Sequence, residues 1–493
     1  MSSVIIPFHL PLPKILPTIE GNVDYRDFRD QLLHINQTLV LSGLEDQFLQ
    51  ADLQQWLKDF PKASAKAQEQ RQLHSRRALR CNIARLLLRN EAYREFAVRL
   101  ADSPLLQFFC GISEVDRVVV PSKSTLQRYT TWWTEPEVRA LSIQLLQTGA
   151  QQPQKLHLPE PVDLATCFLD TTCVCANIHY PVDWVLLRDA TRTLMKAVRL
   201  IRDQGLKHRM EPPECFITRI NRLCIEMTHA GSKDDSQRRR KTTLRKMDRV
   251  VATVGAHARR YRALLDEQWE QTEWTRPQAD QVLQRIDQVL EQLPKARKQA
   301  RQRILSGQLV DNQEKILSLY EREIRVIVRK KAGAEVEFGN TFLLGENPQG
   351  LILDWELFRE TAPADAKLLP RSVARMDIVF GAVLDALGGD RGFDSKANQQ
   401  TLEDADIYNG VCPRSPHQLK ARMRSWKFKK LQQRRGQTEG RVAILKNVFF
   451  GRPMRSKGFE HRELTVTWAV LTHNLWVMAR IMSKAAAALK LAA

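Results

Sequence analysis

The sequence predicts a mixed α/β fold in which an all-helical N-terminal region precedes a mixed β-sheet flanked by helices. Three observations support this class. Apolar residues recur at helical spacing over about 25–150, short apolar runs typical of strands follow residue 162, and helix and strand patterns alternate over 372–411. The chain has 493 residues, which exceeds one ordinary core, so we expect two or three domains.

Residues 1–155 form the predicted helical N-terminal region. Two stretches, 48–60 and 79–100, carry apolar side chains at helical spacing, and Pro121 with Ser122 opens a further helix. Basic residues decorate this region, and two interpretations of them stay open: a solvated helix face or contacts to phosphate. These residues are Arg76, Arg77, Arg80, Arg85 and Arg89.

A Pro- and Gln-rich linker, 151–161, separates this region from the first part of the predicted core, 162–205. The short apolar run over 166–174 suits a buried strand that carries Asp170. Residues 206–330 are strongly charged and predict a basic helical insertion after the first core strand, with no strand of comparable quality. Within it, an apolar seam is predicted at Val282, Ile286, Val289 and Leu293.

The second part of the core, together with C-terminal helices, is predicted over 331–493. Alternation from Ala334 and a run over 351–355 indicate a hairpin or meander, with a turn at Gly339-Asn340. Helices over 372–387 and 394–404 and a strand over 407–411 follow. His473 and Asn474 fall in an apolar helix, where we expect a buried hydrogen-bonded pair.

The charge balance indicates a polyanionic partner, because 76 Lys and Arg residues face 56 Asp and Glu residues, a net charge of +20. Residues 231–260 hold ten Lys or Arg residues against three acids, including Arg238, Arg239, Arg240 and Lys241. Residues 407–438 hold nine and no acid, and there Trp426 and Phe428 interleave with Lys427, Lys429 and Lys430. Base-stacking aromatics among phosphate-binding cations and a basic loop anchored by two apolar plugs both fit this segment.

Ordinary Gly and Pro contents exclude a collagen-like or wholly disordered chain. Polar residues interrupt the most apolar segment, 464–482, so no membrane span is expected. The N-terminus lacks the basic start of a secretory signal, and the eight cysteines include no C-x-x-C pair. We therefore expect a cytoplasmic protein with reduced thiols.

Three acids on separate predicted elements could hold metal ions for phosphodiester chemistry: Asp170, Asp390 and Glu439. Two divalent ions about 4 Å apart activate a nucleophile and stabilise the leaving oxygen, and Mg²⁺ takes oxygen ligands. Each acid also has a structural alternative, as a turn cap, as part of a Gly-rich turn or as a helix N-terminal residue. Arg435 lies four residues before Glu439 and Lys446 seven after it, so a helix would place all three on one face.

The chain resembles the DDE-type transposases of bacterial insertion sequences, whose catalytic core is ribonuclease-H-like. The resemblance covers most of the chain and is weakest over 206–330. It is carried by Leu169-Asp170-Thr171-Thr172, Val336-Glu337-Phe338-Gly339, Leu351-Ile352-Leu353-Asp354-Trp355, Gly389-Asp390-Arg391-Gly392-Phe393 and Glu439-Gly440-Arg441, and in the N-terminal region by Arg77-Ala78-Leu79-Arg80 and Pro121-Ser122-Lys123-Ser124-Thr125.

The resemblance implies that Asp170, Asp390 and Glu439 are a catalytic triad that binds two Mg²⁺ ions, for which Mn²⁺ can substitute. Arg435, Glu439 and Lys446 match a signature of related transposases that begins with Tyr, and Gln432 stands at that position here. The implied DNA contacts are Arg435 and Lys446, with the basic segments adding Arg238, Arg239, Arg240, Lys241, Lys427, Lys429 and Lys430.

The implied function is a transposase that binds insertion-sequence ends through the N-terminal helices, cuts double-stranded DNA and joins the ends to target DNA. Cutting two ends in one complex calls for a homodimer or higher oligomer, and such an enzyme would be associated with the bacterial nucleoid. Two alternatives stay open: a catalytically inactive nucleic-acid-binding protein on the same fold, and a metal-dependent nuclease without strand transfer.

Overall fold

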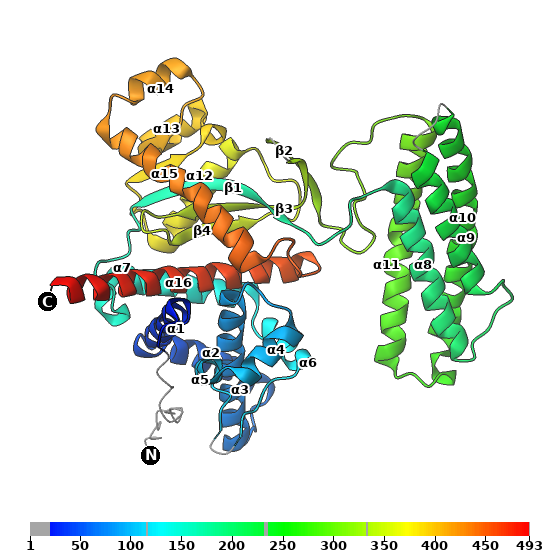
Figure 1. Ribbon diagram of the computed structural model, residues 1–493, viewed down its shortest axis with the longest axis horizontal. Helices are drawn as coiled ribbons and strands as arrows, with labels where there is room; N and C mark the ends of the chain where they lie inside the picture. Colours follow the sequence, from blue (N-terminus) through cyan, green and yellow to red (C-terminus); the bar gives the residue numbers. More distant parts are fainter. Residues whose placement is uncertain (1–19, 115–116, 231–234, 332–333, 493) are drawn as a thin grey trace. The chain divides into compact units, whose positions relative to one another are not determined.

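The computed structural model describes residues 20–114, 117–230, 235–331 and 334–492, and the chain divides into two compact units (Figure 1). Unit 1 comprises Met1–Cys175, Thr341–Phe358 and Ala362–Ala493, and unit 2 comprises Ala176–Asn340 and Arg359–Thr361. Each unit buries its own large cluster of apolar side chains. Among the described residues, no helix is both long enough and apolar enough to cross a bilayer.

The N-terminal part of unit 1 is entirely helical. Three of its helices, α1, α3 and α6, begin at Asn22, Ser64 and Ser122, whose side chains accept a hydrogen bond from the backbone of the first turn. The C-terminal helix α16 (Phe459–Ala492) packs against α1, α3 and α7 (Figure 1). The helices are α1 (Val23–Leu41), α2 (Leu44–Asp59), α3 (Ala65–Leu87), α4 (Tyr93–Asp102), α5 (Pro104–Cys110), α6 (Lys123–Thr130) and α7 (Glu135–Gln151).

Three of the five arginines that the sequence analysis singled out match neither of its two interpretations. Arg77, Arg80 and Arg85 are buried, so they neither line a solvated face nor lie free for phosphate. Arg76 is half-buried and pairs with Asp46, whereas Arg89 is exposed and fits both interpretations. Arg80 donates to the buried Glu45 carboxylate, with its Nε 2.6 Å from Oε1, and burial of both partners leaves this pair inside the helical core. Charge in this helix stabilises packing between helices.

A six-stranded mixed sheet follows, with strand order β2-β3-β1-β5-β6 and with β4 paired to β3. Strands β1, β5 and β6 run parallel, while β3 is antiparallel to both β2 and β4. The fold class predicted from the sequence is confirmed: a helical N-terminal region, a mixed sheet flanked by helices, and a large helical insertion after the first strand. The strands are β1 (Thr166–Cys175), β2 (Arg325–Lys331), β3 (Ala334–Glu346), β4 (Ile352–Leu357), β5 (Ala386–Gly389) and β6 (Tyr408–Val411).

Helices cover both faces of the part of the sheet that belongs to unit 1. Successive residues of β4 point to opposite faces. The Asp354 carboxylate accepts hydrogen bonds from α12 (Asp365–Phe380), whereas the Trp355 indole donates to Thr467 of α16. Helix α15 (Trp426–Ile444), continued by a π-helical segment (Leu445–Phe450), packs on β1, β5 and β6. Two shorter helices complete this part, α13 (Lys396–Asp404) and α14 (Pro416–Arg422).

Three local predictions were wrong. Residues 325–331 form strand β2 inside a segment predicted to be helical, because pairing with β3 outweighs their high charge. Gly339 and Asn340 form no turn, since β3 continues through them and the turn lies at 347–350 instead. Helix α12 ends at Phe380, so part of the predicted helix 372–387 is the strand β5.

Unit 2 is built around a bundle of α8 (Asp183–Asp203), α9 (Pro213–His229), α10 (Ser236–Gln268) and α11 (Arg276–Ala300). The sequence placed α8 in the first part of the core, whereas its apolar face packs against the other three helices of the bundle. The predicted seam is largely as expected: Ile286, Val289 and Leu293 are buried and Val282 is half-buried.

Candidate active site and nucleic-acid surfaces

Asp170 and Asp390 lie at matching positions on neighbouring parallel strands. The register pairs Leu169 of β1 with Gly389, the last residue of β5, so Asp170 in the middle of β1 lies beside Asp390, the first residue after β5. The crevice outside the carboxyl end of a parallel strand is a usual place for a ligand, and Asp390 lies at that end of β5. The Asp170 carboxylate accepts from the Thr171 amide at 2.7 Å, and the Asp390 carboxylate accepts from the Gly392 amide at 2.7 Å.

A further carboxylate, which the sequence did not single out, stands beside Asp390. Asp365 begins α12, and its Oδ1 accepts from the Thr171 hydroxyl at 3.1 Å. A Cβ atom at Gly392 would lie 2.5 Å from Asp365 Oδ2 and 2.9 Å from Asp390 Oδ1. Any residue other than glycine at this position would force at least one of these carboxylates to move, so Gly392 leaves the space that the two carboxylates occupy.

Helix α15 covers the face of β1 that carries Asp170. Phe168, Asp170 and Thr172 share that face because side chains alternate along a strand. The Arg434 guanidinium lies 5.2 Å from the centre of the Phe168 ring, and Lys446 Nζ donates to Thr172 Oγ1 at 3.4 Å. Glu439 lies on α15 between these two contacts, is exposed, and bonds to no residue that the structure describes.

The three acids do not form a closed ligand cluster. Among the residues that the structure describes, their ligand oxygens are not all within 4.8 Å of one another. Two metal ions about 4 Å apart are held by ligands on both ions, so a two-ion site does not require all three acids within that distance.

Comparison with models of known protein families, with curated proteins and with solved structures finds no match.

A buried carboxylate on the sheet holds α15 in place. Glu346, the last residue of β3, is fully buried and receives three side chains of that helix. Arg434 Nη1 lies 2.9 Å from Glu346 Oε1, Thr438 Oγ1 2.8 Å from the same oxygen, and Arg441 Nε 3.1 Å from Oε2. Because these donors are spaced at helical intervals, the carboxylate fixes both the rotation and the register of α15.

The same network continues into α16. Arg441 Nη1 lies 3.3 Å from His473 Nε2, and His473 Nδ1 lies 3.5 Å from Asn474 Oδ1, which confirms the predicted buried pair. Since Arg441 can only donate, Nε2 accepts and Nδ1 carries the proton. Burial, reinforced by the positive charge of Arg441, lowers the pKa of His473 to about 3.

The expected DNA-contacting residues of α15 differ in their surroundings. Arg435 is half-buried, and its Nε donates to Gln432 Oε1 at 3.3 Å, while Gln432 itself donates to the Gly410 carbonyl of β6. Gln432 thus anchors the helix to the sheet. Lys427, Lys429 and Lys430 are exposed.

The structure separates Trp426 from Phe428, which the sequence left as either base-stacking aromatics or apolar plugs. Phe428 is fully buried under the Arg422 guanidinium, which lies 4.9 Å from the ring centre, so it is an apolar plug. Trp426 is 72% exposed and remains available to a ligand.

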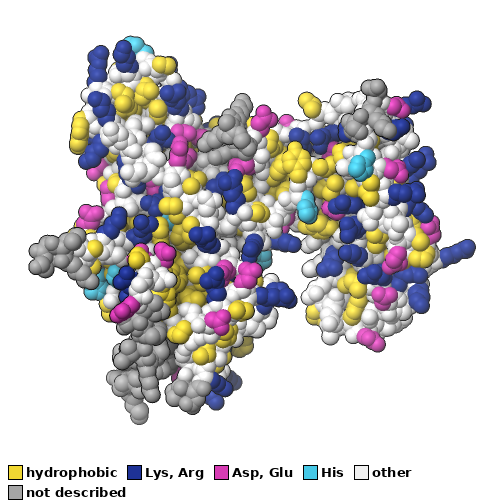
Figure 2. All heavy atoms as spheres, viewed as in Figure 1, with side chains coloured by type: hydrophobic (Ala, Val, Ile, Leu, Met, Phe, Trp, Pro, Cys, Tyr) yellow, Lys and Arg dark blue, Asp and Glu magenta, His cyan; other side chains and the backbone are white. Residues whose placement is uncertain are grey.

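The basic run at the start of α10 is partly exposed. Arg238 and Arg239 are exposed, whereas Arg240 and Lys241 are half-buried, with the Arg240 guanidinium 5.8 Å from the Trp184 ring centre. Further along α10 the outward-facing cations form no ion pair with a described residue, and Figure 2 shows Lys and Arg gathered over the side of the bundle formed by α9 and α10. These additional residues are Arg245, Lys246, Arg249, Arg259 and Arg260.

Asp354, which belongs to one of the segments that carry the resemblance, is a buried structural acid. Its carboxylate accepts from Ser372 and from two nitrogens of Arg375. It is therefore committed to packing between β4 and α12.

Glu346 and Asp365 were not predicted from the sequence. Glu346 ends an otherwise apolar run, Phe342-Leu343-Leu344-Gly345, and an acid there signals a buried partner. Asp365 opens a helix, a position where acids are common, so nothing distinguished it.

Proposed function

We propose that the protein is a DNA transposase of the DDE type, which binds the ends of an insertion sequence, cuts them and joins them to target DNA. The observation that carries the proposal is the pairing of Leu169 with Gly389, since it puts Asp170 of β1 beside Asp390 at the point where β5 ends. The packing of the Glu439 helix on the Asp170 face of β1 supports it.

The available ligands suit the ions that this chemistry needs. Asp170, Asp390 and Glu439 offer only carboxylate oxygens, which are the ligands that Mg²⁺ and Mn²⁺ prefer. When bound, a pair of such ions activates the attacking hydroxyl and stabilises the leaving oxygen. Asp170 and Asp390 would hold the ions against β1 and β5, and Glu439 would complete the set from α15.

Basic side chains around these acids would hold the DNA. Arg435 lies one helical turn before Glu439, and Lys446 reaches β1 two residues beyond Asp170. Both cations can bind phosphate oxygens next to the acids. The exposed lysines of α15 and the outer arginines of α10 would neutralise flanking duplex, while two DNA ends cut in one complex require at least two copies of the chain. We further propose that the protein acts at the bacterial nucleoid.

The substitution Asp390→Asn tests the chemistry. It removes a carboxylate charge and keeps the side-chain shape, so we expect Mg²⁺-dependent nicking of supercoiled DNA to fall by at least a hundredfold while DNA affinity stays within about twofold. Asp354→Asn is unsuitable as a control because Asp354 is buried, whereas Asp404→Asn on the exposed end of α13 should leave nicking unchanged.

Three outcomes separate the candidate functions. Undiminished nicking by Asp390→Asn would exclude the proposed site. Nicking without any joined product would favour a metal-dependent nuclease. DNA binding by the unmodified chain with no metal-dependent cleavage of any substrate would favour a non-catalytic binding protein.

A further inference from the structure

The first turn of α15 presents an aromatic ring to solvent among cations. Trp426 begins the helix, and the Ser425 side chain caps it by accepting from the Phe428 amide at 3.4 Å. The indole is 72% exposed, and Lys430 Nζ lies 4.9 Å from its ring centre. Arg424, Lys427 and Lys429 are exposed around it. A ligand that stacks on the indole would therefore have cations within reach of its own negative charge.

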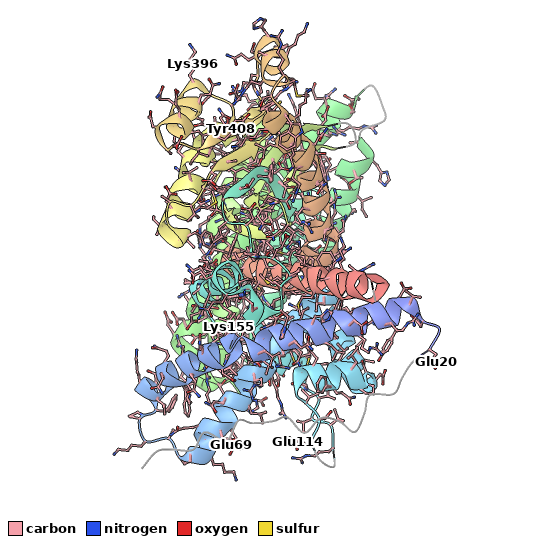
Figure 3. The ribbon with its side chains drawn as sticks, turned by 90° about the vertical axis from the view of Figure 1, so that its left-hand side faces the viewer. Glu20, Glu69, Glu114, Lys155, Lys396 and Tyr408 are labelled. Carbon is pink, nitrogen blue, oxygen red and sulfur yellow. The ribbon has the colours of Figure 1, made fainter. Side chains whose placement is uncertain are left out.

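A second aromatic side chain is fixed next to the first. Tyr408, the first residue of β6, has its hydroxyl 3.2 Å from Ser425 Oγ, the residue that caps α15. Lys427 Nζ lies 4.3 Å from the Tyr408 ring centre. Figure 3 shows Tyr408 close to the helix that Lys396 begins, α13. We call Tyr408, Trp426, Lys427 and Lys430 the aromatic lip.

The aromatic lip borders a polar cleft of about 850 Å³. Tyr408, Arg422 and Lys427 line one side of this cleft, while Asp385, Glu403 and Asp406 supply carboxylates to it. The volume is typical of a ligand site and exceeds that of a nucleobase. The acids exclude a phosphate from the cleft itself, but they can accept hydrogen bonds from the amino groups of bases.

We propose that the aromatic lip binds an unpaired DNA strand, with a base stacked on Trp426 and the adjoining phosphates at Lys427 and Lys430. That the nucleic acid is DNA rests on the proposed function, and the new statement is that this DNA is unpaired. In a duplex each base is stacked between its neighbours and cannot cover the indole, so the ring selects a strand that has lost its pairing.

The division of charge supports this orientation of the strand. The acid-free segment 407–438 supplies every cation of the aromatic lip, and the carboxylates of the cleft lie before that segment, at 385, 403 and 406. Since Lys427 contacts the Tyr408 ring and both residues line the cleft with these acids, a backbone that follows Lys430 and Lys427 would bring its next base to Tyr408 and the cleft.

The experiment measures the fluorescence anisotropy of a labelled oligothymidine in EDTA, titrated with the full chain at several salt concentrations. EDTA removes any contribution from cleavage. We expect Trp426→Ala to weaken binding about tenfold with an unchanged salt dependence, because it removes stacking and no charge. Trp426→Phe should keep most of the affinity. Lys430→Ala should instead reduce the slope of log affinity against log salt by roughly 0.7.

Two controls define specificity. A blunt duplex of mixed sequence should bind Trp426→Ala and the unmodified chain equally within about twofold. Tyr180→Ala removes another aromatic ring, 76% exposed and outside the aromatic lip, and should leave oligothymidine binding unchanged.

The proposal fails if Trp426→Ala binds oligothymidine as well as the unmodified chain does, or if it weakens duplex binding equally. If the unmodified chain binds oligouridine more tightly than oligothymidine, and Trp426→Ala weakens oligouridine binding tenfold, the aromatic lip binds RNA and the DNA assignment is overturned. Failure of the transposase proposal is separable, since loss of metal-dependent nicking in Asp390→Asn is measured in another assay and does not depend on Trp426.

Discussion

Two pairs of arginines, one on helix α15 and one on helix α10, have opposite surroundings. Arg434 and Arg441 of α15 point to a buried carboxylate, Glu346, and are both less than one-fifth exposed. Arg245 and Arg249 of α10 face solvent without an ion pair to any described residue. The difference is that one helix is anchored to a sheet by its charges, while the other leaves its charges exposed to solvent. A basic run in a sequence can therefore be either a set of buried anchors or an exposed charged surface, and only the groups around it distinguish the two.

The largest effect is expected from removing the carboxylate that distinguishes the two groups. Glu346→Ala leaves two guanidinium groups without their counter-charge, and the free energy of unfolding should fall by about 3–5 kcal/mol. Urea denaturation measures the change. Glu439→Gln, on the exposed side of the same helix, is the matched control and should stay within about 0.5 kcal/mol. Equal midpoints for Glu346→Ala and the unmodified chain would contradict the anchoring role.

A second prediction concerns His473, which contacts Arg441 of this network. The pKa of His473 is lowered to about 3 in the folded chain and is near 6.5 in the unfolded chain, so the unfolded chain binds the proton at a higher pH. Stability should therefore fall as the pH drops from about 6.5 toward 3, by about 1.4 kcal/mol per unit from this group.

His473→Gln should remove that part of the slope in urea denaturations between pH 7 and pH 4.5. His461→Gln, at an exposed position of the same helix, should leave it in place. An unchanged slope for His473→Gln would show that the ring is not held neutral.

Substitutions on α10 should have the smallest effect on the free energy of unfolding and a clear effect on DNA binding. Arg245→Glu combined with Arg249→Glu should weaken duplex DNA binding at least tenfold and lower its salt dependence by roughly 0.9 for each phosphate that the variant no longer neutralises. The free energy of unfolding should change by less than about 0.5 kcal/mol. Filter binding at several salt concentrations measures the first effect.

The control for this pair is Lys196→Glu with Arg199→Glu on α8, which adds the same charge to the same bundle. A uniform loss of affinity in both double variants would mean that net charge alone attracts DNA, and that α10 carries no defined contact surface.

The sequence predicted most of the fold because its signals are local. The apolar run of β1 and the helical spacing in α11 need no distant partner to be recognised. Strand β2 was missed because Arg325, Arg329, Lys330 and Lys331 give it the composition of the charged helices around it, and only pairing with β3 makes it extended.

The candidate site likewise contains residues that local sequence signals indicate and residues that only the fold shows. Asp170 could be singled out as an acid within an apolar strand run and Asp390 as an acid at a glycine turn after an apolar stretch, and the structure adds that their strands are neighbours. Glu346 could not be assigned a role, since its partners Arg434, Thr438 and Arg441 lie about ninety residues further along the chain. Likewise, no local pattern shows that Phe428 is buried while Trp426 is exposed, because helical rotation and the Arg422 contact decide it.

The helical insertion also bears on how the chain reaches its native state. The Ala176 amide donates to the Phe338 carbonyl at 2.9 Å, so the points where the chain leaves for the bundle and returns from it are hydrogen-bonded to each other within unit 2. A bundle that folds autonomously would bring its own ends together before the sheet assembles, since Asp183 at the start of α8 accepts from Gln299 near the end of α11 at 2.8 Å. The conformational entropy of closing this long loop is then given up during bundle formation, and β3 can join the sheet as quickly as if a short hairpin preceded it.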